Sequence, residues 1–199
     1  MRRYISQILK YLGLKKKSFF TNEYPEFKND EIGKYTYGRP RILFRNNTSK
    51  LKIGKYCSIS ENVKIFLGGN HRIDWVSTYP FSVIEKLKHV AGKIKGHPAT
   101  KGSVIIENDV WIGHSVVLLS GITIENGAVI GANSVVTKSV GPYEIWAGNP
   151  AKLIKKRFSD DSIEKLLKYK WWDKNTNEIE EIVPLLCHNN IEKLFNHAK

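Results

Sequence analysis

One histidine of this chain stands in a setting that suits proton transfer. His71 occurs in the stretch GGNHRIDWVSTYPF, among polar and aromatic residues that include Asn70, Asp74, Trp75 and Tyr79. Imidazole titrates near neutral pH, so a positioned histidine can remove the proton of a reacting hydroxyl. Its second ring nitrogen then needs a carbonyl or carboxylate partner, which the sequence does not identify. His71 is therefore a candidate general base, and the alternative is an ordinary histidine of a surface loop.

The remaining histidines carry weaker signals. His114 lies inside a repeat unit, where a structural role is favoured. His89 and His97 are expected to be solvated or to line a substrate, and the histidines near the C-terminus look incidental. No pair has the spacing of a metal site, so no metal is expected.

The composition of the chain limits the classes of protein to which it can belong. The chain has 199 residues, 41% of them hydrophobic, with a formal net charge of +13. No nucleic-acid module is apparent, so the charge favours solubility and a phosphate-bearing ligand over a nucleic-acid partner. No apolar run approaches the roughly 20 residues of a membrane span, and the N-terminus is a poor signal peptide. Cys57 and Cys187 are far apart, which suits a reducing compartment. We expect a cytoplasmic protein.

A period of six residues sets the fold. Aliphatic residues recur at every sixth position, at Ile106, Ile112, Leu118, Ile124, Ile130 and Val136. A second row follows four residues after each, at Val110, Val116, Ile122, Ala128, Ser134 and Val140. An earlier block repeats the pattern at Ile53, Ile59 and Ile65 and places Cys57 in an interior, structural position. Six residues fit a short strand and a turn, so we predict stacked coils around one core.

This pattern resembles the hexapeptide-repeat acyltransferases. The resemblance implies an all-β fold, a left-handed parallel β-helix with three hexads in each coil. The β-helix is expected over residues 30–150, with an irregular first coil and an extruded loop at residues 66–105. Residues 1–29 are expected to form a basic helical segment, and residues 151–199 a helical tail. The basic N-terminal segment is interpreted as a packing helix, with weak membrane-surface association as the alternative.

The interrupting loop closely resembles the signature of the xenobiotic branch of this family, the chloramphenicol and streptogramin acetyltransferases. In that branch the histidine at the position of His71 is the catalytic base. Asp74, in the same stretch as His71, is assigned to the acceptor site. Tyr37 resembles an acceptor-contacting tyrosine of the antibiotic-modifying members, although Tyr35 is adjacent and either ring could serve packing.

The stretch GANSVVTKSVGPYEIWAGNPAKLIKKRF resembles the coenzyme-A-binding exit of the family. It implies that acetyl-CoA is the acetyl donor, with backbone contact to the pantetheine arm, contacts to the adenosine and basic side chains near the phosphates. The residues assigned to these roles are Ala132, Thr137, Lys138, Gly148, Lys152 and Lys155. The lysines replace arginines of the galactoside branch, and lysine is a point charge, not a bidentate fork.

The resemblance implies an O-acetyltransferase that works by direct attack of an acceptor hydroxyl on acetyl-CoA. It also implies a homotrimer whose active sites lie at subunit interfaces. The acceptor is expected to be an antibiotic-like small molecule or a sugar. Alternatives are acetylation of a nucleotide sugar, a lipopolysaccharide or a capsular polysaccharide, since this scaffold serves several acceptors. A non-catalytic trimeric scaffold is a weaker alternative.

Overall fold

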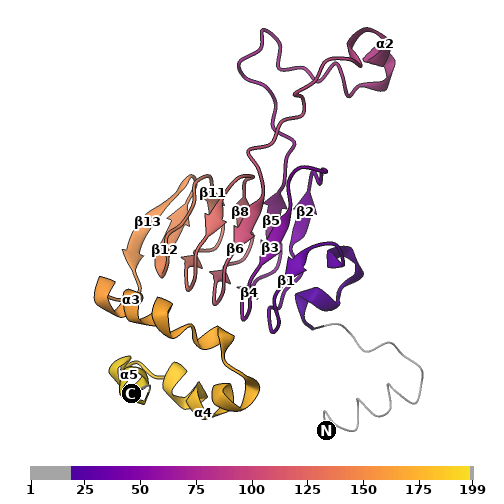
Figure 1. Cartoon of the computed structure of the whole chain (residues 1–199). Coiled ribbons are helices and arrows are strands. Elements are labelled where there is room, and N and C mark those ends of the chain that lie inside the picture. Colours follow the sequence, from indigo (N-terminus) through magenta and orange to yellow (C-terminus); the bar gives the residue numbers. More distant parts are fainter. Residues whose placement is uncertain (1–18, 198–199) are drawn as a thin grey trace, which may run out of the picture.

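The computed structural model describes residues 19–197, which form a left-handed parallel β-helix with a projecting loop and a helical tail (Figure 1). Short strands stack into three flat faces. The first face contains β1 (Glu31–Ile32), β3 (Leu51–Ile53), β6 (Val104–Ile106) and β9 (Thr123–Ile124). The second contains β4 (Ser58–Ile59), β7 (Trp111–Ile112), β10 (Val129–Ile130), β12 (Glu144–Gly148) and β13 (Ala151–Lys156). The third contains β2 (Arg41–Leu43), β5 (Lys64–Phe66), β8 (Val117–Leu118) and β11 (Val135–Val136).

The six-residue period is confirmed as three hexads in each coil. Ile106 pairs on the first face with Ile124, its counterpart three repeat positions later. Leu118 pairs in the same way with Val136 on the third face. Every member of both predicted rows is buried, as are the earlier repeat positions and Cys57. The aliphatic rows therefore form one continuous column of core inside the coils.

The corners of the coils need left-handed backbone conformations. Asp109, Ser115 and Asn133 have φ values of 57°, 57° and 59° and recur at intervals that are multiples of six. Asn and Asp tolerate this region better than other non-glycine residues. At Gly127, where φ is 68°, a Cβ atom would lie 2.3 Å from the ring of Tyr143. Glycine is therefore required at that corner both for conformation and for space.

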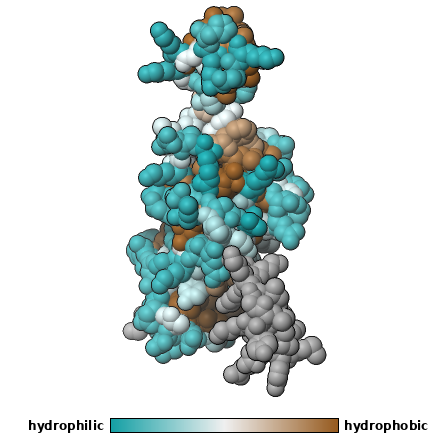
Figure 2. Space-filling view, turned by 90° about the vertical axis from the view of Figure 1, so that its right-hand side faces the viewer, coloured by the Kyte–Doolittle hydropathy of each residue, from teal (hydrophilic) through white to brown (hydrophobic). Residues whose placement is uncertain are grey.

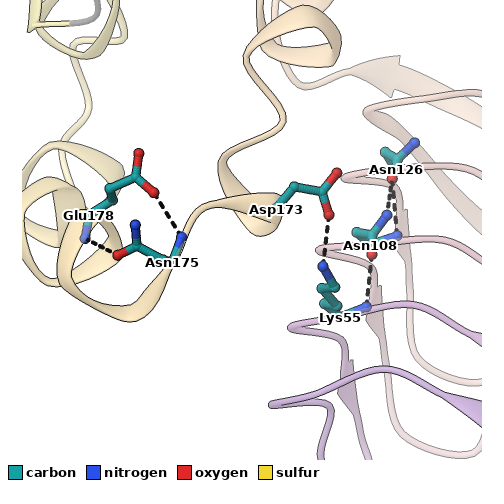
Figure 3. Close-up of polar contacts among 6 residues, drawn as sticks. All are labelled: Lys55, Asn108, Asn126, Asp173, Asn175 and Glu178. Carbon is teal, nitrogen blue, oxygen red and sulfur yellow. Dashed lines mark hydrogen bonds and ion pairs between the residues drawn. The ribbon is translucent and has the colours of Figure 1, made fainter.

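A ladder of polar side chains closes the corner between the first and second faces (Figure 3). The Lys55 amide donates to Oδ1 of Asn108 at 2.8 Å, and Nδ2 of Asn108 donates to Oδ1 of Asn126 at 2.9 Å. These bonds satisfy groups that the corners leave without strand partners. The Lys55 ammonium also lies 2.8 Å from the Asp173 carboxylate, which joins this corner to the tail.

The first coil is irregular, as the sequence predicts. Ile32 pairs with Ile53 and Ile42 pairs with Ile65, and both separations in sequence are longer than a regular coil and differ from each other. Residues 1–18, which carry most of the predicted basic helix, lie outside the described part of the chain. The remainder of that segment contains two 3-10 turns, η1 (Thr21–Glu23) and η2 (Pro25–Phe27).

The projecting loop spans residues 67–103, because Phe66 ends β5 and Val104 begins β6. It carries a 3-10 turn, η3 (Glu85–Leu87), and one short helix, α2 (Lys88–Ala91). Figure 1 shows it standing away from the β-helix on a narrow neck. The coils on either side of the loop stay in register, so the loop is an insertion that leaves the stacking unchanged.

The tail begins as a strand, which corrects the expectation of a helical tail from residue 151. β13 pairs antiparallel with β12, because the turn before it reverses the chain. The helical part contains α3 (Asp160–Tyr169), η4 (Trp171–Asp173), α4 (Thr176–Leu186) and α5 (Glu192–His197). Its helices lie along one long edge of the β-helix (Figure 1). They form a second core with Tyr143.

Side chains cap the N-termini of two helices of the tail. Ser159 caps α3 by accepting the amide of Ser162, and Asn175 and Glu178 form a reciprocal capping box at α4 (Figure 3). Such caps satisfy amides that have no partner within the helix. Among residues 19–197, no helix is long and apolar enough to cross a membrane.

Candidate active site

The neck of the loop is held by a small antiparallel bridge next to His71. The Asn70 amide donates to the Ala99 carbonyl at 3.0 Å, and the Ala99 amide donates to the Asn70 carbonyl at 2.7 Å. Nδ2 of Asn70 also donates to Oγ of Ser120 at 3.1 Å. Ser120 is buried at the corner that follows β8, so the residue before His71 is anchored to the solid part of the β-helix.

The structure supplies the partner of His71 that the sequence could not identify. Nδ1 of His71 lies 2.8 Å from the backbone carbonyl oxygen of Thr78. A carbonyl can only accept, so Nδ1 carries the proton and the neutral ring has its lone pair on Nε2. The side chain of His71 is exposed. This arrangement presents Nε2 as a base, in the way that second partners of catalytic histidines usually fix the tautomer.

His97 packs directly against His71, which the sequence did not predict. The two rings meet edge to face, with centroids 4.7 Å apart and an interplanar angle of 83°. His97 is buried instead of solvated, and neither of its ring nitrogens has a hydrogen-bond partner within residues 19–197. A cavity of about 130 Å³ lies beside it and is lined by Trp75, Ser77, Tyr79, Phe81, Ser82, Ile94 and His97.

Asp74, assigned to the acceptor site, is engaged by a neighbour. Nε of Arg72 donates to Oδ1 of Asp74 at 2.7 Å, and a second guanidinium nitrogen contacts Oδ2. The hydrogen bond from Arg72 lowers the pKa of Asp74 to about 2. The Arg72 guanidinium also lies 5.2 Å from the ring centroid of Trp75. Asp74 therefore helps to order the loop through Arg72, and nothing in the described residues brings it to Nε2 of His71.

Two of the residues assigned to acetyl-CoA meet at the corner between the second and third faces. Ala132 and Gly148 are both exposed there, on successive coils. Buried Ser134 joins the coils, since its hydroxyl donates to the Gly131 carbonyl at 2.7 Å and accepts the Gly148 amide at 3.0 Å. Gly148 has a φ of 104°, as its place in a tight turn before Pro150 requires.

Thr137 and Lys138 lie at a different corner, between the third and first faces. They follow β11 directly, and the Val136 carbonyl accepts the amide of Leu119, the residue before Ser120. Thr137 and Lys138 are therefore one coil beyond Ser120 and two coils beyond the neck of the His71 loop, a step of about 4.8 Å for each coil. This pair shares its corner with the neck of the loop, whereas Ala132 and Gly148 lie at the far edge of the third face.

Lys152 and Lys155 project from β13, at the end of the β-helix. They pair with Ala147 and Ile145 of β12, and both side chains are exposed. Arg157, just beyond, turns inward and donates to the Gly127 carbonyl at 2.6 Å. The exit of the chain therefore combines a structural arginine with exposed lysines that are available to an anionic ligand.

Tyr37 lies away from His71 within one chain. It pairs with Ser58 on the second face, and its ring stacks on Phe19 with centroids 5.6 Å apart. Tyr35 stacks in turn on Tyr56 at 4.9 Å. Both tyrosines belong to an aromatic stack along the first coil, although Tyr37 remains 42% exposed.

The side chains of Cys57 and His114 have surroundings that fit a structural role. Sγ of Cys57 is buried 2.9 Å from the Glu107 carbonyl, and burial raises the pKa of the thiol to about 12. Nε2 of His114 lies 3.4 Å from the side-chain nitrogen Nδ2 of Asn62 at a corner. Within residues 19–197, no three His, Cys, Asp or Glu side chains gather as metal ligands.

Comparisons with known proteins agree with this architecture. The family model described as "Bacterial transferase hexapeptide (six repeats)" matches residues 103–138. A "Probable macrolide acetyltransferase" of Lysinibacillus sphaericus is 48% identical over 150 residues, covering 74% of this chain and 83% of that protein. A "Chloramphenicol acetyltransferase" of Klebsiella aerogenes is 39% identical over 184 residues, covering 85% and 87%. A "Virginiamycin A acetyltransferase" of Staphylococcus aureus is 44% identical over 189 residues, covering 88% and 85%.

These relatives match most of the chain. The repeat, the interrupted coil and the similarity therefore lead to one assignment. This chain belongs to the hexapeptide-repeat acetyltransferases, in their xenobiotic branch, and is an acetyl-CoA-dependent O-acetyltransferase.

Proposed function

We propose that this enzyme acetylates a hydroxyl of an apolar, antibiotic-like molecule, with His71 as the general base. The observation that carries the proposal is the hydrogen bond from Nδ1 of His71 to the Thr78 carbonyl, which leaves Nε2 free to accept a proton. The loop that holds His71 also favours an apolar acceptor over a sugar. It exposes the large apolar side chains of Ile73, Val76, Tyr79, Phe81, Val83, Val90 and Ile94. Figure 2 shows brown, hydrophobic surface on this projecting segment.

The reaction needs one group that accepts and returns a proton, and it needs no acyl-enzyme intermediate. The acceptor oxygen attacks the thioester carbonyl carbon of acetyl-CoA while its proton passes to Nε2 of His71. The Thr78 carbonyl stabilises the imidazolium that forms, because it accepts the bond from Nδ1. When the tetrahedral intermediate collapses, the carbon–sulfur bond breaks. His71 then returns its proton to the leaving thiolate, giving the acetyl ester and free coenzyme A.

We infer that the complete site forms between subunits of a homotrimer. His71 leaves the β-helix at the corner between the third and first faces, whereas Ala132 and Gly148 lie at the opposite edge of the third face. Tyr37 lies on the second face. These residues can surround one acceptor and one donor only if neighbouring copies bring different corners together. The lysines of β13 would then contact the phosphates of acetyl-CoA.

An acceptor panel tests the proposal. Purified enzyme receives acetyl-CoA with chloramphenicol, a macrolide, virginiamycin or a sugar acceptor, and release of free thiol is recorded. We expect transfer to at least one antibiotic and little to the sugar. His71→Ala is expected to lower kcat about 10²- to 10⁴-fold while the melting temperature stays unchanged. Near-normal turnover by this variant would remove His71 from the mechanism, and sole activity on the sugar would overturn the choice of acceptor.

A further inference from the structure

Packing alone does not explain why a histidine occupies position 97. Both ring nitrogens are buried without a hydrogen-bond partner among the described residues, and His97 is only 9% exposed. Each unsatisfied buried polar group costs about 1–3 kcal/mol. A phenylalanine would fill the same space against His71 and Trp75 without that cost. Such a group needs a partner that the described part of this chain does not itself provide.

The surroundings of His97 indicate what that partner is. The ring contacts His71 at 4.7 Å between centroids, and it lines the cavity of about 130 Å³ within the loop. Ser77 and Ser82 add hydroxyl groups to a lining that is otherwise mainly aromatic and aliphatic. A cavity of this volume takes a compact part of a small molecule but not a whole antibiotic. His71 does not line the cavity itself, but its ring contacts the ring of His97, which does, so the part that enters lies on the same side of the loop as the proposed base.

We propose that His97 determines acceptor specificity by binding a second polar group of the acceptor inside this cavity. A neutral imidazole offers one donor and one acceptor, so it can pair with a hydroxyl or an amide. The terminal torsion of histidine is broad, which allows the ring to turn a nitrogen toward a ligand that enters. The preferred acceptors then carry a second hydroxyl or amide in addition to the acetylated hydroxyl. This inference rests on the proposed function.

Two variants of His97 separate hydrogen bonding from packing. His97→Phe keeps a ring against His71 but removes both polar nitrogens, whereas His97→Asn keeps a donor and an acceptor in a smaller side chain. For the reactive acceptor of the panel, His97→Phe is expected to raise the acceptor KM about three- to tenfold, the effect of one lost hydrogen bond. The KM for acetyl-CoA is expected to stay unchanged. His97→Asn is expected to recover part of the loss.

The acceptor provides the matched control. A deoxy analogue that lacks the second polar group is expected to raise the KM of the natural enzyme by a similar factor. His97→Phe should then add no further loss with this analogue, because the two changes remove the same bond. This comparison also works with the unaltered protein, so it remains informative if a His97 variant folds poorly. Calorimetric binding of the acceptor to His71→Ala, with and without His97→Phe, gives a readout that does not depend on turnover.

Each outcome has a defined meaning. Equal KM values for the acceptor and its deoxy analogue would overturn the inference, and so would an additive loss in the combined experiment. A fall in kcat with both acceptors, at constant KM, would overturn it as well, by showing that His97 only supports the ring of His71. Absence of thiol release by the natural enzyme with every acceptor would instead overturn the proposed function, and this inference with it.

Discussion

Nδ2 of Asn70 donates a hydrogen bond to Oγ of Ser120, far away in the sequence, at a distance of 3.1 Å. The same hydroxyl oxygen accepts the Lys101 amide at 3.2 Å. One buried serine therefore ties both strands of the neck to the coil that follows the loop, immediately beside His71. The position of the proposed base depends on the β-helix through this contact.

Replacing that serine is expected to loosen the catalytic loop. Ser120→Ala leaves Nδ2 of Asn70 and the backbone amide of Lys101 without this partner, which should lower the free energy of unfolding by about 1–3 kcal/mol. The turnover number should fall because the His71 base becomes less ordered, while the KM for acetyl-CoA changes little. Urea unfolding and steady-state kinetics measure both effects. Ser120→Thr, which keeps the hydroxyl, serves as the control, and equal kinetics of Ser120→Ala and the natural enzyme would contradict the anchoring role.

The exposed lysines of β13 are expected to bind the phosphates of the acetyl donor. Lys152→Ala and Lys155→Ala should each raise the KM for acetyl-CoA several-fold, and added salt should reduce the difference. Neither variant should change the KM for acetyl-pantetheine, because that donor lacks the adenosine phosphates. Lys28→Ala, which removes an exposed lysine after η2, is the matched control. A parallel loss with both donors would show that the lysines support the fold instead.

The two cysteines are expected to differ sharply in reactivity. Burial raises the pKa of Cys57 to about 12, whereas Cys187 is exposed. Iodoacetamide under mildly alkaline conditions should label Cys187 alone, because the thiolate is the nucleophile. Mass spectrometry of Cys187→Ser should then find almost no label in the native protein and one label after denaturation. Rapid native labelling of Cys57 would contradict its place in the core.

The same burial links stability to pH. Between the ordinary thiol pKa of 9.0 and a value of about 12, the unfolded chain loses the Cys57 proton and the folded chain keeps it. The unfolded state then binds fewer protons, so this group lowers the free energy of unfolding as pH rises through that range. Denaturant titrations of the natural enzyme and Cys57→Ala across this range measure the difference, which should shrink with rising pH. A constant difference would contradict this account.

The phenol of Tyr143 is expected to be dispensable for stability. Its hydroxyl is buried without a hydrogen-bond partner in the part of the chain that the structure describes, while its ring lies 5.3 Å from the Arg157 guanidinium and packs within the second core. Tyr143→Phe should therefore leave the free energy of unfolding unchanged or raise it by about 1 kcal/mol. Tyr143→Ala, which removes the ring, should lower it by about 3–5 kcal/mol. A clear loss in Tyr143→Phe would indicate a water molecule bound to the hydroxyl.

The sequence predicted the β-helix well because its core repeats. Ile112 and Ile130 occupy equivalent places in successive coils, so one rule describes both. The sequence did not predict strand β13, because Ala151–Lys156 follows the last hexad and its apolar and polar residues do not alternate regularly. Its pairing depends on the reversal at Asn149-Pro150, and only the tertiary structure shows that this segment returns along β12.

The site was predictable only where it depended on a motif. His71 could be found from its surroundings in sequence, but its partner Thr78 contributes a backbone carbonyl, which any residue type supplies. His97 comes from the far end of the loop and joins His71 through an irregular segment with no period to follow. The contact of Arg72 with the Asp74 carboxylate was not predicted either, because the sequence does not show which way these two side chains turn.

The register across the projecting loop has a consequence for how such enzymes diversify. Ile53 and Ile106, Ile59 and Ile112, and Ile65 and Leu118 all pair at one constant separation in sequence. The loop therefore leaves and rejoins the β-helix at one corner, and the strands of the adjoining coils pair in the same register as they would without it. Changes in its length or content carry no cost in strand pairing. The loop can therefore be exchanged as a module without disturbing the coils that carry the other end of the same chain.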